Sequence, residues 1–482
     1  MTSLHTSAQC RELDRIAIVE HGIPGFELML RAGRAAFGEL TTRWPRARSI
    51  TVFCGKGNNA GDGYVIAGLA RETGFDTQVL QIGDGGFEGD AELARLWAAE
   101  RGAAPEPGDA PARGEVLVDA LLGTGLKGPP RAAFAAAVSR INASGRPVLA
   151  VDVPTGVSGD TGAVLGEAVH ADVTVSFIGA KLGLHTGPAL GVRGQLVHAG
   201  LGVPQSVIDR VPGCPLLTFD SGSLPPLAVG LYKHRAGHLV VAGGDLDMGG
   251  APLMAAEAAL RTGAGLVSVV TRAAHRPAIL ARRPEIMVQD ADDEDAVAGL
   301  LERATALAIG PGIGRGSWGG SLFRRALAMP RPMLIDADGL RWLAELDLTP
   351  GAPPVVTPHA AEAAQLLGCS VAEVEADRPA SALRLARTVR GVAVLKGPGT
   401  VCAADRLLGV CAHGNPGMAT AGMGDVLSGV IGGLLAQGLS AADSATIGAC
   451  LHSRAADLAA ERGSQRGLTA TDLYETIVEL LG

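Results

Sequence analysis

Short runs of β-branched and aliphatic residues alternate along the chain with longer segments whose apolar positions recur at helical spacing. Such alternation predicts an α/β protein, with parallel sheets covered by helices on both faces. The expected strands are residues 49–54, 77–82, 116–120, 148–153 and 172–177 in the first half, and 238–242, 266–270, 285–288, 306–310, 333–336, 354–357 and 392–396 in the second. The expected helices include residues 7–21, 25–42, 62–73 and 131–143, and a helical region follows Asp425.

The alternation lapses between Val203 and Leu227, where the chain is rich in proline and serine and has no period. Such a segment is typical of a domain boundary. We therefore expect two α/β/α domains, an N-terminal one with a Rossmann-like parallel sheet (residues 1–210) and a C-terminal one (residues 233–482), joined by a linker (residues 211–232). Neither half repeats the other, so the two domains are expected to differ.

Composition narrows the classes of function. Hydrophobic residues make up 47% of the 482 residues and charged residues 19%, which allows extensive cores and argues against disorder. A net charge of −8 and only 3% aromatic residues disfavour binding to nucleic acid or to anionic membranes. The 68 glycines follow no collagen-like period and are expected in the loops between strands and helices, where α/β folds commonly bind ligands.

The seven cysteines show no CxxC motif and no spacing that indicates disulfides or a zinc site. We expect them to be buried thiols in a reducing compartment. The N-terminus lacks a basic segment followed by an apolar one, and no apolar run approaches the ~18 residues of a membrane-spanning helix. A cytoplasmic protein without a membrane partner is therefore expected.

The most informative segment is residues 414–438, which reads GNPGMATAGMGDVLSGVIGGLLAQG. It delivers Asp425 to the first turn of an apolar helix rich in small residues. Glycines let backbone N–H groups close around an anion, and the helix N-terminus adds a partial positive charge. Asp425 could then remove a proton from a hydroxyl while these N–H groups stabilise a transferring phosphoryl group. The alternative is an aspartate that merely caps a packed helix.

Three further elements of the first half place an aspartate and a glycine turn at the carboxyl end of a predicted strand. They are GKGNNAGDG at residues 55–63, VDALLGTG at residues 118–125 and VDVPTG at residues 151–156. Each aspartate could cap the next helix, but three such elements at one sheet edge favour a shared ligand crevice.

With these motifs the first half, residues 7–205, resembles the NAD(P)H-hydrate epimerase domain of the YjeF N-terminal family. The resemblance implies that the hydrated dinucleotide contacts two segments and Asp152, which is the acid/base candidate. The segments are Asn58, Asn59, Ala60, Gly61 and Asp62, and Gly123, Thr124, Gly125, Leu126, Lys127, Gly128 and Pro129. It also implies K⁺ near Asn59, Asp119 and Thr155, although sequence does not separate K⁺ from Na⁺ or from a hydrogen-bond network. Ala60 and Thr155 stand where the family commonly has glycine and serine.

The second half carries a longer series of glycine motifs. They are GGDLDMGGAP at residues 243–252, RTGAGL at 261–266, IGPGIG at 309–314, LIDADG at 334–339, VTPHAAE at 356–362, LKGPGT at 395–400 and the GMGD loop. Together they resemble the ADP-dependent NAD(P)H-hydrate dehydratase family, of ribokinase-like fold, over residues 233–480.

This second resemblance implies ADP as co-substrate and Mg²⁺ in the dehydratase domain. The implied nucleotide-binding residues are Lys396, Gly397, Pro398, Gly399, Thr400 and Gly424. The implied contacts to the hydrated dinucleotide are Gly265, Gly312, Gly314, His359 and Asp425. His359 could equally be a helix-capping histidine, and Lys396 a solvated charge at a strand end.

The two resemblances together imply a bifunctional enzyme that repairs hydrated NADH and NADPH and forms a homo-oligomer. One rival interpretation is an ATP-dependent kinase for a small alcohol, because the lysine–glycine and GxGD elements serve the ribokinase-like fold generally. Another is a first half that only binds a nucleotide or a partner, without catalysis. Retention of Asp119, Asp152 and the Asn-Asn loop speaks against the latter.

Overall fold

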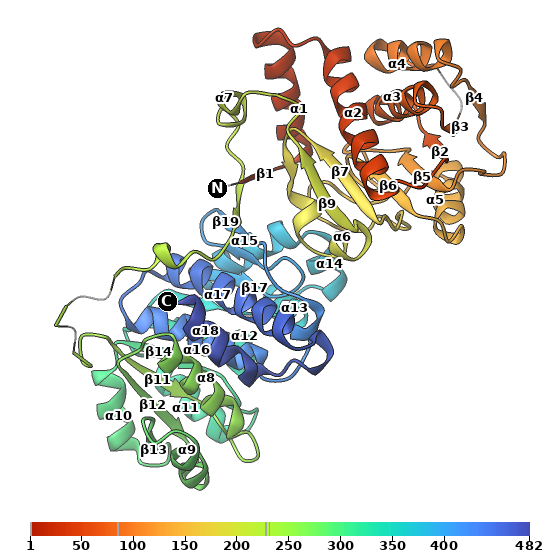
Figure 1. Ribbon diagram of the computed structural model, residues 1–482. Coiled ribbons are helices and arrows are strands. Elements are labelled where there is room, and N and C mark those ends of the chain that lie inside the picture. The colour runs from red at the N-terminus through yellow and green to blue at the C-terminus, as the bar shows by residue number, and fades with distance from the viewer. Residues whose placement is uncertain (1, 84–85, 227–228, 231, 347) are drawn as a thin grey trace. The chain divides into compact units, whose positions relative to one another are not determined.

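The computed structural model describes residues 2–83, 86–226, 229–230, 232–346 and 348–482. Its chain divides into two compact units, Met1–Pro215 and Leu216–Gly482, which are described separately below (Figure 1). Residues 227, 228 and 231 of the predicted linker lie outside the described residues.

The first unit is built on a parallel sheet of seven strands within the described residues. The strands, in sheet order, are β4 (Pro105–Pro107), β3 (Asp76–Gln81), β2 (Ser49–Cys54), β5 (Val116–Ala120), β6 (Val148–Val151), β7 (Val173–Phe177) and β9 (Gln195–Ala199). Chain order reverses between β2 and β5, as in the doubly wound nucleotide-binding folds. The carboxyl ends of these two strands therefore flank the crevice where such sheets bind ligands.

Helices cover both faces of this sheet, because alternate strand residues point to opposite sides. Ile50, Val52 and Cys54 of β2 join one buried cluster with the helices α1 to α4, whereas Phe53 joins a second cluster with α5 (Figure 1). The helices of this unit are α1 (Ser7–Arg15), α2 (Gly25–Arg43), α3 (Asn58–Glu72), α4 (Gly89–Glu100), α5 (Ala132–Ala143), α6 (Ala189–Val192) and α7 (Gln205–Ile208).

Besides β4 and β9, three short strands among the described residues were not predicted: β1 (Ser3–His5), β8 (Ala180–Lys181) and β10 (Cys214–Leu217). Strand β1 pairs with β8 in parallel and with the first residues of β10 in antiparallel. The last two residues of β10, Leu216 and Leu217, belong to the second unit and pair within it with β19 (Leu407–Cys411). The segment predicted as a linker, residues 211–232, thus contains a strand. Runs of three or four residues are too short for hydrophobic periodicity to predict such a strand.

The second unit repeats the same order of its first six strands and extends it. The strands, in sheet order, are β13 (Met287–Asp290), β12 (Leu266–Thr271), β11 (His238–Ala242), β14 (Ala306–Ile309), β15 (Met333–Ile335), β16 (Pro354–Val356), β17 (Val392–Leu395), β18 (Val401–Ala403) and β19. The pairs from β13 to β17 are parallel, whereas β18 and β19 form an antiparallel hairpin beside β17. This hairpin was not predicted, because the alternation of strands and helices indicates parallel strands.

The helices of the second unit are α8 (Gly250–Arg261), α9 (Arg276–Arg282), α10 (Glu294–Arg303), α11 (Ser317–Leu327), α12 (Asp338–Glu345), α13 (Ala360–Leu367), α14 (Val371–Ala376), α15 (Arg378–Val389), α16 (Met423–Ala436), α17 (Ala441–Arg462) and α18 (Leu473–Leu480). Helices α8, α16 and α17 share one buried cluster with the sheet. Helix α16 is buried almost along its whole length. Gly429 and Gly433 allow this burial, because a Cβ on either would crowd α8.

The predicted strands agree with the observed ones to within two residues at each end. One correction concerns α3, which begins at Asn58 rather than Asp62, so the Asn-Asn segment forms the first turn of the helix and not a loop before it. A second concerns β6, which ends at Val151 because Asp152 adopts a left-handed backbone, with φ of 65°. A third concerns the helix expected over residues 7–21, where α1 ends at Arg15 and a π-helical turn follows over Ile16–Glu20.

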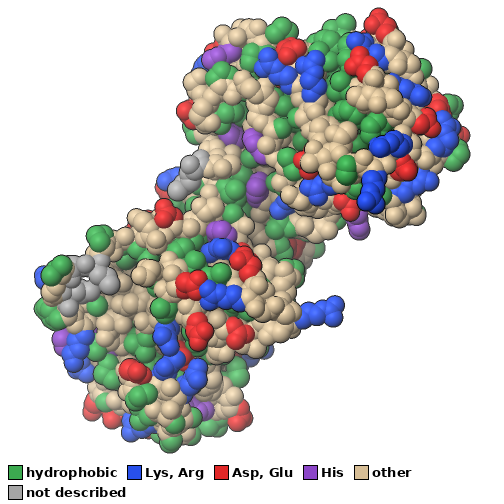
Figure 2. Space-filling view, in the orientation of Figure 1, with side chains coloured by type: hydrophobic (Ala, Val, Ile, Leu, Met, Phe, Trp, Pro, Cys, Tyr) green, Lys and Arg blue, Asp and Glu red, His purple; other side chains and the backbone are tan. Residues whose placement is uncertain are grey.

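All seven cysteines are free thiols, and five of them are buried. Positive and negative side chains are interspersed over both units on the face shown in Figure 2. No helix among the described residues has both the length and the apolar character needed to cross a membrane.

Candidate active sites

The first candidate site lies where the ends of β2 and β5 meet the first turn of α3. The N–H groups of a helix's first turn have no internal acceptors, so Asn58, Asn59 and Ala60 present donors there. Ala60 is buried inside the helix and its φ is not positive, so its methyl group causes no backbone strain. The substitution of alanine for the family's glycine is therefore compatible with this conformation.

Asn59 is the most unusual side chain of this site. Both of its amide atoms, Oδ1 and Nδ2, are buried and have no hydrogen-bond partner among the described residues. Its side chain lies against the Cα of Gly123, in the loop that follows β5. Buried amides are nearly always satisfied, so this one points to a group that binds here.

Asp119 of β5 and Thr155, which follows β6, form hydrogen bonds with each other. The Thr155 hydroxyl donates to Asp119 Oδ1 at 2.7 Å, and the Thr155 N–H donates to Oδ2 at 2.8 Å. The same hydroxyl accepts from Leu122 N at 3.1 Å. Burial raises the pKa of Asp119 to about 6, against the lowering effect of these hydrogen bonds. The Thr155 hydroxyl thus makes hydrogen bonds that a serine hydroxyl could also make.

The loop of residues 123–129 has no regular structure and is partly or fully exposed. Added Cβ atoms on Gly125 or Gly128 would meet no neighbouring atom within 4 Å. The loop therefore borders open space beside Asn59, as a segment that contacts a ligand would.

Asp152 follows β6 and pairs with Lys181, a residue that the sequence analysis did not select. Lys181 Nζ lies 2.5 Å from Asp152 Oδ1, and the lysine side chain is only 4% exposed. Asp62 of α3 and Asp14 of α1 are the nearby carboxyls: burial, then the charge of Asp152, raises the pKa of Asp62 well above its usual value. Burial, partly offset by Lys181, raises the pKa of Asp14 to about 6.

The second candidate site lies at the carboxyl ends of β15, β16 and β17. Lys396 Nζ donates to Asp336 Oδ1 at 2.8 Å and lies 3.8 Å from Glu362 Oε2. Ser428 Oγ of α16 donates to Asp336 Oδ2 at 2.8 Å. Burial acts to lower the pKa of Lys396, but Asp336 and Glu362 outweigh it and the pKa is raised, so the lysine is a cation at neutral pH.

The N-terminus of α16 meets this ion pair. Gly422 opens the helix with φ of 89°, and a Cβ on Gly424 would lie 3.4 Å from both Lys396 Nζ and Asp336 Oδ2. Asp425 is in the first turn, as the sequence predicted. Burial, then the charge of Asp336, raises the pKa of Asp425 to about 7, with Lys396 acting in the opposite direction. A carboxylate that titrates near neutral pH beside free helix N–H groups is suited to act as a base.

The segment from Lys396 to Thr400 turns sharply after β17, with left-handed glycines at Gly397 (φ 138°) and Gly399 (φ 61°). Arg378, whose side chain is fully buried, donates through Nη2 to the carbonyls of Leu395 and Lys396, each at 3.1 Å. The Arg378 cation therefore supports this turn, and no motif in the sequence predicted that role.

Gly312 and Gly314 lie after β14, both left-handed, and pack against the loop of residues 243–252 that follows β11. That is the point where strand order reverses in this unit. Gly310 of the same segment lies against the Asp336 carbonyl, which links this loop to the Lys396–Asp336 pair. Gly265 is placed elsewhere: its N–H donates to Ala236 at the amino end of β12, and its neighbour Gly237 faces Ala436 at the far end of α16. The structure does not bring Gly265 to Asp425.

His359 caps α13. Its Nδ1 accepts from the N–H groups of Ala361 and Glu362, and the Glu362 carboxylate accepts from the His359 N–H in return. Since Nδ1 is an acceptor, the ring proton is on Nε2, and the ring is 56% exposed. Capping therefore leaves an exposed N–H donor beside Glu362.

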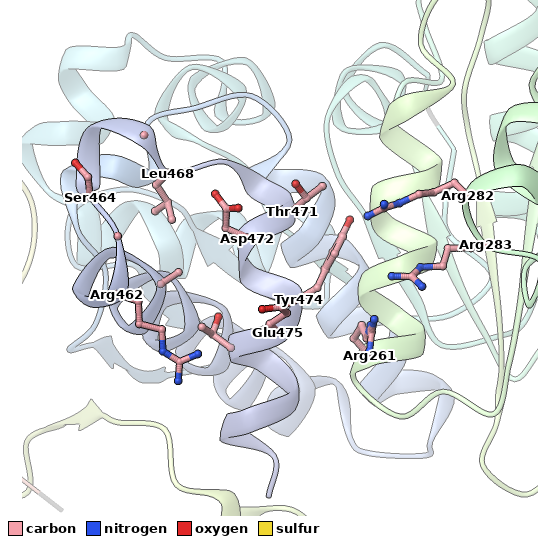
Figure 3. Close-up of a pocket in the computed structure, with 14 residues that line it drawn as sticks. Arg261, Arg282, Arg283, Arg462, Ser464, Leu468, Thr471, Asp472, Tyr474 and Glu475 are labelled. Carbon is pink, nitrogen blue, oxygen red and sulfur yellow. The ribbon is translucent and has the colours of Figure 1, made fainter.

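A cavity of 470 Å³ in the second unit contains none of the predicted site residues. In Figure 3, Tyr474 and Glu475 lie between Arg462 on one side and Arg261, Arg282 and Arg283 on the other. Arg282 and Arg283 pair with Glu257, and Arg462 pairs with Glu479. These ion pairs compensate most of the positive charge that lines the cavity, so we do not choose it as the candidate site.

Two family models match the chain: NAD(P)H-hydrate dehydratase over residues 239–479, and YjeF-related protein N-terminus over residues 25–183. A bifunctional NAD(P)H-hydrate repair enzyme of Coxiella burnetii is 46% identical, over 98% of this chain and 98% of its own. The chain belongs to the bifunctional NAD(P)H-hydrate repair enzyme family.

Solved structures agree for the second unit of this repair enzyme. A ribokinase-like superfamily protein from Enterococcus faecalis has a TM-score of 0.52 and 26% identity, over 55% of this chain and 95% of its own. An ADP/ATP-dependent NAD(P)H-hydrate dehydratase from Bacillus subtilis, co-crystallised with ATP and Mg²⁺, has a TM-score of 0.50 and 26% identity, over 55% and 97%. The ribokinase-like fold expected for the C-terminal part is confirmed.

Proposed function

We propose that this enzyme repairs hydrated NADH and NADPH in two steps, one in each unit. The first unit interconverts the R and S hydrates, and the second dehydrates the S form at the expense of ADP, giving NAD(P)H, AMP and phosphate. The observation that carries the proposal is Asp425, a carboxylate with a pKa of about 7 in the first turn of a buried helix, beside the Lys396–Asp336 pair.

The second unit faces a difficult leaving group, because hydroxide departs poorly from carbon 6 of the hydrated ring. Asp425 takes the proton of this hydroxyl as the hydroxyl oxygen attacks the β-phosphorus of ADP, and AMP leaves. The N–H groups of Ala421 to Gly424 receive the charge of the transferring phosphoryl group. The ring nitrogen then expels phosphate, and loss of a proton from carbon 5 completes NAD(P)H.

The nucleotide is assigned to Lys396, Gly397, Pro398, Gly399, Thr400 and Gly424. Lys396 reaches the phosphates as a cation next to Gly424, and the left-handed glycines let the backbone approach them closely. Mg²⁺ would neutralise phosphate charge. No group of three or more His, Cys, Asp or Glu side chains among the described residues is arranged to hold a metal ion, which fits a Mg²⁺ carried mainly by ADP oxygens.

In the first unit the hydrated dinucleotide is assigned to the first turn of α3, the loop of residues 123–129 and Asp152. Asp152 transfers the proton as carbon 6 loses and regains its configuration. The unsatisfied Asn59 amide fits a K⁺ bound through its oxygen at this edge. Bound K⁺ would supply fixed positive charge for the phosphates, while Asp119 and Thr155 hold the loops in place.

One assay tests the whole proposal. Purified protein is mixed with both epimers of hydrated NADH, and the absorbance of reduced nicotinamide is followed after adding ADP, ATP or no nucleotide. We expect complete recovery of NADH with AMP and phosphate formed in equal amounts. Recovery of only the S fraction would contradict the epimerase assignment. A phosphorylated alcohol accumulating with ATP, without NADH formation, would favour the rival kinase.

A further inference from the structure

The ion pair between Asp152 and Lys181 has a role to explain, because nothing in the proposed function uses the lysine. Lys181 lies in the short strand β8, which the neighbouring strand β1 holds by backbone pairing through His5. Its Nζ also donates to the Phe177 carbonyl at 2.7 Å. Both the backbone and the head group of the lysine are thus fixed, and its charge is aimed at one carboxylate oxygen.

Asp152 is fixed from the other side. Its N–H donates to Val175 at 2.8 Å, and its Oδ1 accepts from the Phe177 N–H at 3.3 Å. Its left-handed φ of 65° is unfavourable for a residue with a side chain. Such a conformation persists where surrounding contacts enforce it, and the contact with Lys181, at 2.5 Å, is the shortest of these three.

The other titratable groups that face this pair among the described residues come from four elements. They are His5 of β1, Asp14 and Cys10 of α1, Asp62 of α3 and His198 of β9. Burial, against the raising effect of an Ile178 carbonyl, lowers the pKa of His198, so the imidazole is neutral at physiological pH. Three carboxyl groups therefore share one lysine cation among the described residues of this cluster. Among these carboxyl groups, Asp152 is the one in direct contact with the lysine.

We propose that Lys181 is a positioning residue of the epimerase: its ion pair with Asp152 holds that carboxyl in one orientation and in its left-handed backbone conformation, ready to meet the substrate hydroxyl. This inference rests on the proposed function, because it fixes the orientation of Asp152 for that reaction. The step it supports is simple. The O–H bond of the substrate hydroxyl breaks, and the proton joins an Asp152 oxygen.

Lys181→Met and Lys181→Arg test the role. Epimer exchange is measured by separating the two hydrates over time without ADP at pH 7, and chemical denaturation of each variant serves as the folding control. For Lys181→Met we expect kcat to fall at least tenfold with little change in KM. Lys181→Arg keeps the cation and should restore most of kcat.

A double variant separates positioning from packing. If Lys181 acts through Asp152, adding Lys181→Met to Asp152→Asn should cost no further activity. The inference is overturned if Lys181→Met raises KM and leaves kcat unchanged, or if the effects of the two substitutions multiply. It is also overturned if Lys181→Arg behaves like Lys181→Met. Absence of epimer exchange in the unaltered chain would instead refute the proposed function itself.

Discussion

Both units place three carboxyl groups and one lysine at the carboxyl edge of a sheet with the same initial strand order, yet the lysine is used differently. In the first unit Lys181 pairs directly with Asp152, the candidate proton-transfer group. In the second unit Lys396 pairs with Asp336 and leaves Asp425 without a salt bridge among the described residues. The same components thus give a proton-transfer candidate in direct contact with its lysine in one unit, and in the other a candidate without that contact, whose pKa burial raises to about 7.

The position of each cluster also differs. In the first unit the candidate residues gather around the reversal of strand order between β2 and β5, the usual place for a ligand in this topology. In the second unit the corresponding reversal, between β11 and β14, carries glycine loops, while the ion pair lies further along the sheet at β15 and β17. The N-terminus of helix α16 meets the sheet at this ion pair and so brings Asp425 to it. Topology alone therefore does not locate the chemistry.

The strongest way to separate the two sites is Asp425→Asn. Loss of the base should reduce dehydration at least ~10²-fold, because general bases contribute roughly that much. Epimer exchange, measured by separating the hydrates, should be unchanged. Asp152→Ala should give the reverse pattern. Loss of both activities in either variant would show that the two sites are coupled or that the variant misfolds.

Lys396→Met tests whether the second lysine is structural as well as a phosphate ligand. It strands the buried Asp336 carboxylate, and breaking such a pair typically costs ~3 kcal/mol or more. Since the Lys396 side chain is 21% exposed, we expect a loss of up to about 3 kcal/mol in the free energy of unfolding of this unit. Chemical denaturation measures it, with Ser428→Ala, expected to cost about 1 kcal/mol, as the matched control. Equal stability of both variants would refute the structural role.

The pH dependence should distinguish the two carboxylates. Asp425 acts as a base only when ionised, and burial raises its pKa to about 7. The kcat/KM of dehydration should therefore fall about tenfold for each pH unit below 7. Epimer exchange does not use Asp425, so this acid limb should be specific to dehydration. The same limb in epimer exchange would contradict the comparison.

Replacing K⁺ by Na⁺ or Li⁺ probes a difference confined to the first unit. If the unsatisfied Asn59 amide binds K⁺, epimer exchange should slow severalfold while dehydration of the S epimer with Mg²⁺ and ADP does not. Asn59→Ala should remove the cation dependence. A cation effect that survives in this variant would place the ion elsewhere.

The smallest expected effect concerns His359. His359→Ala removes the cap of α13 and should cost ~1 kcal/mol of stability, read from thermal unfolding. His359→Asn keeps a capping side chain and should restore most of it. If dehydration is lost in both variants, His359 contacts substrate through its exposed ring in addition to capping. Full activity of His359→Asn would leave capping as its role.

Local patterns in the chain were sufficient to predict two α/β domains, the strand ends and the place of Asp425 in the first turn of α16. These features depend on residues within about a dozen positions of one another, which hydrophobic period, glycine turns and helix-start signals report directly. The sequence also predicted three strands that end in Asp336, Thr357 and Lys396. Because these strands are neighbours in the sheet, their shared edge could have suggested the ion pair between Asp336 and Lys396.

Folding in three dimensions was needed for the partners. Lys181 and Arg378 both lie in segments without a recognised motif. Lys181 nevertheless pairs with Asp152, and Arg378 supports the turn after β17. Gly265 carries a family-like motif but lies at the opposite edge of its sheet from Asp425. Ion pairs and burial depend on which strands become neighbours, and so do the resulting pKa values. Distant segments meet only when the sheet and its covering helices assemble.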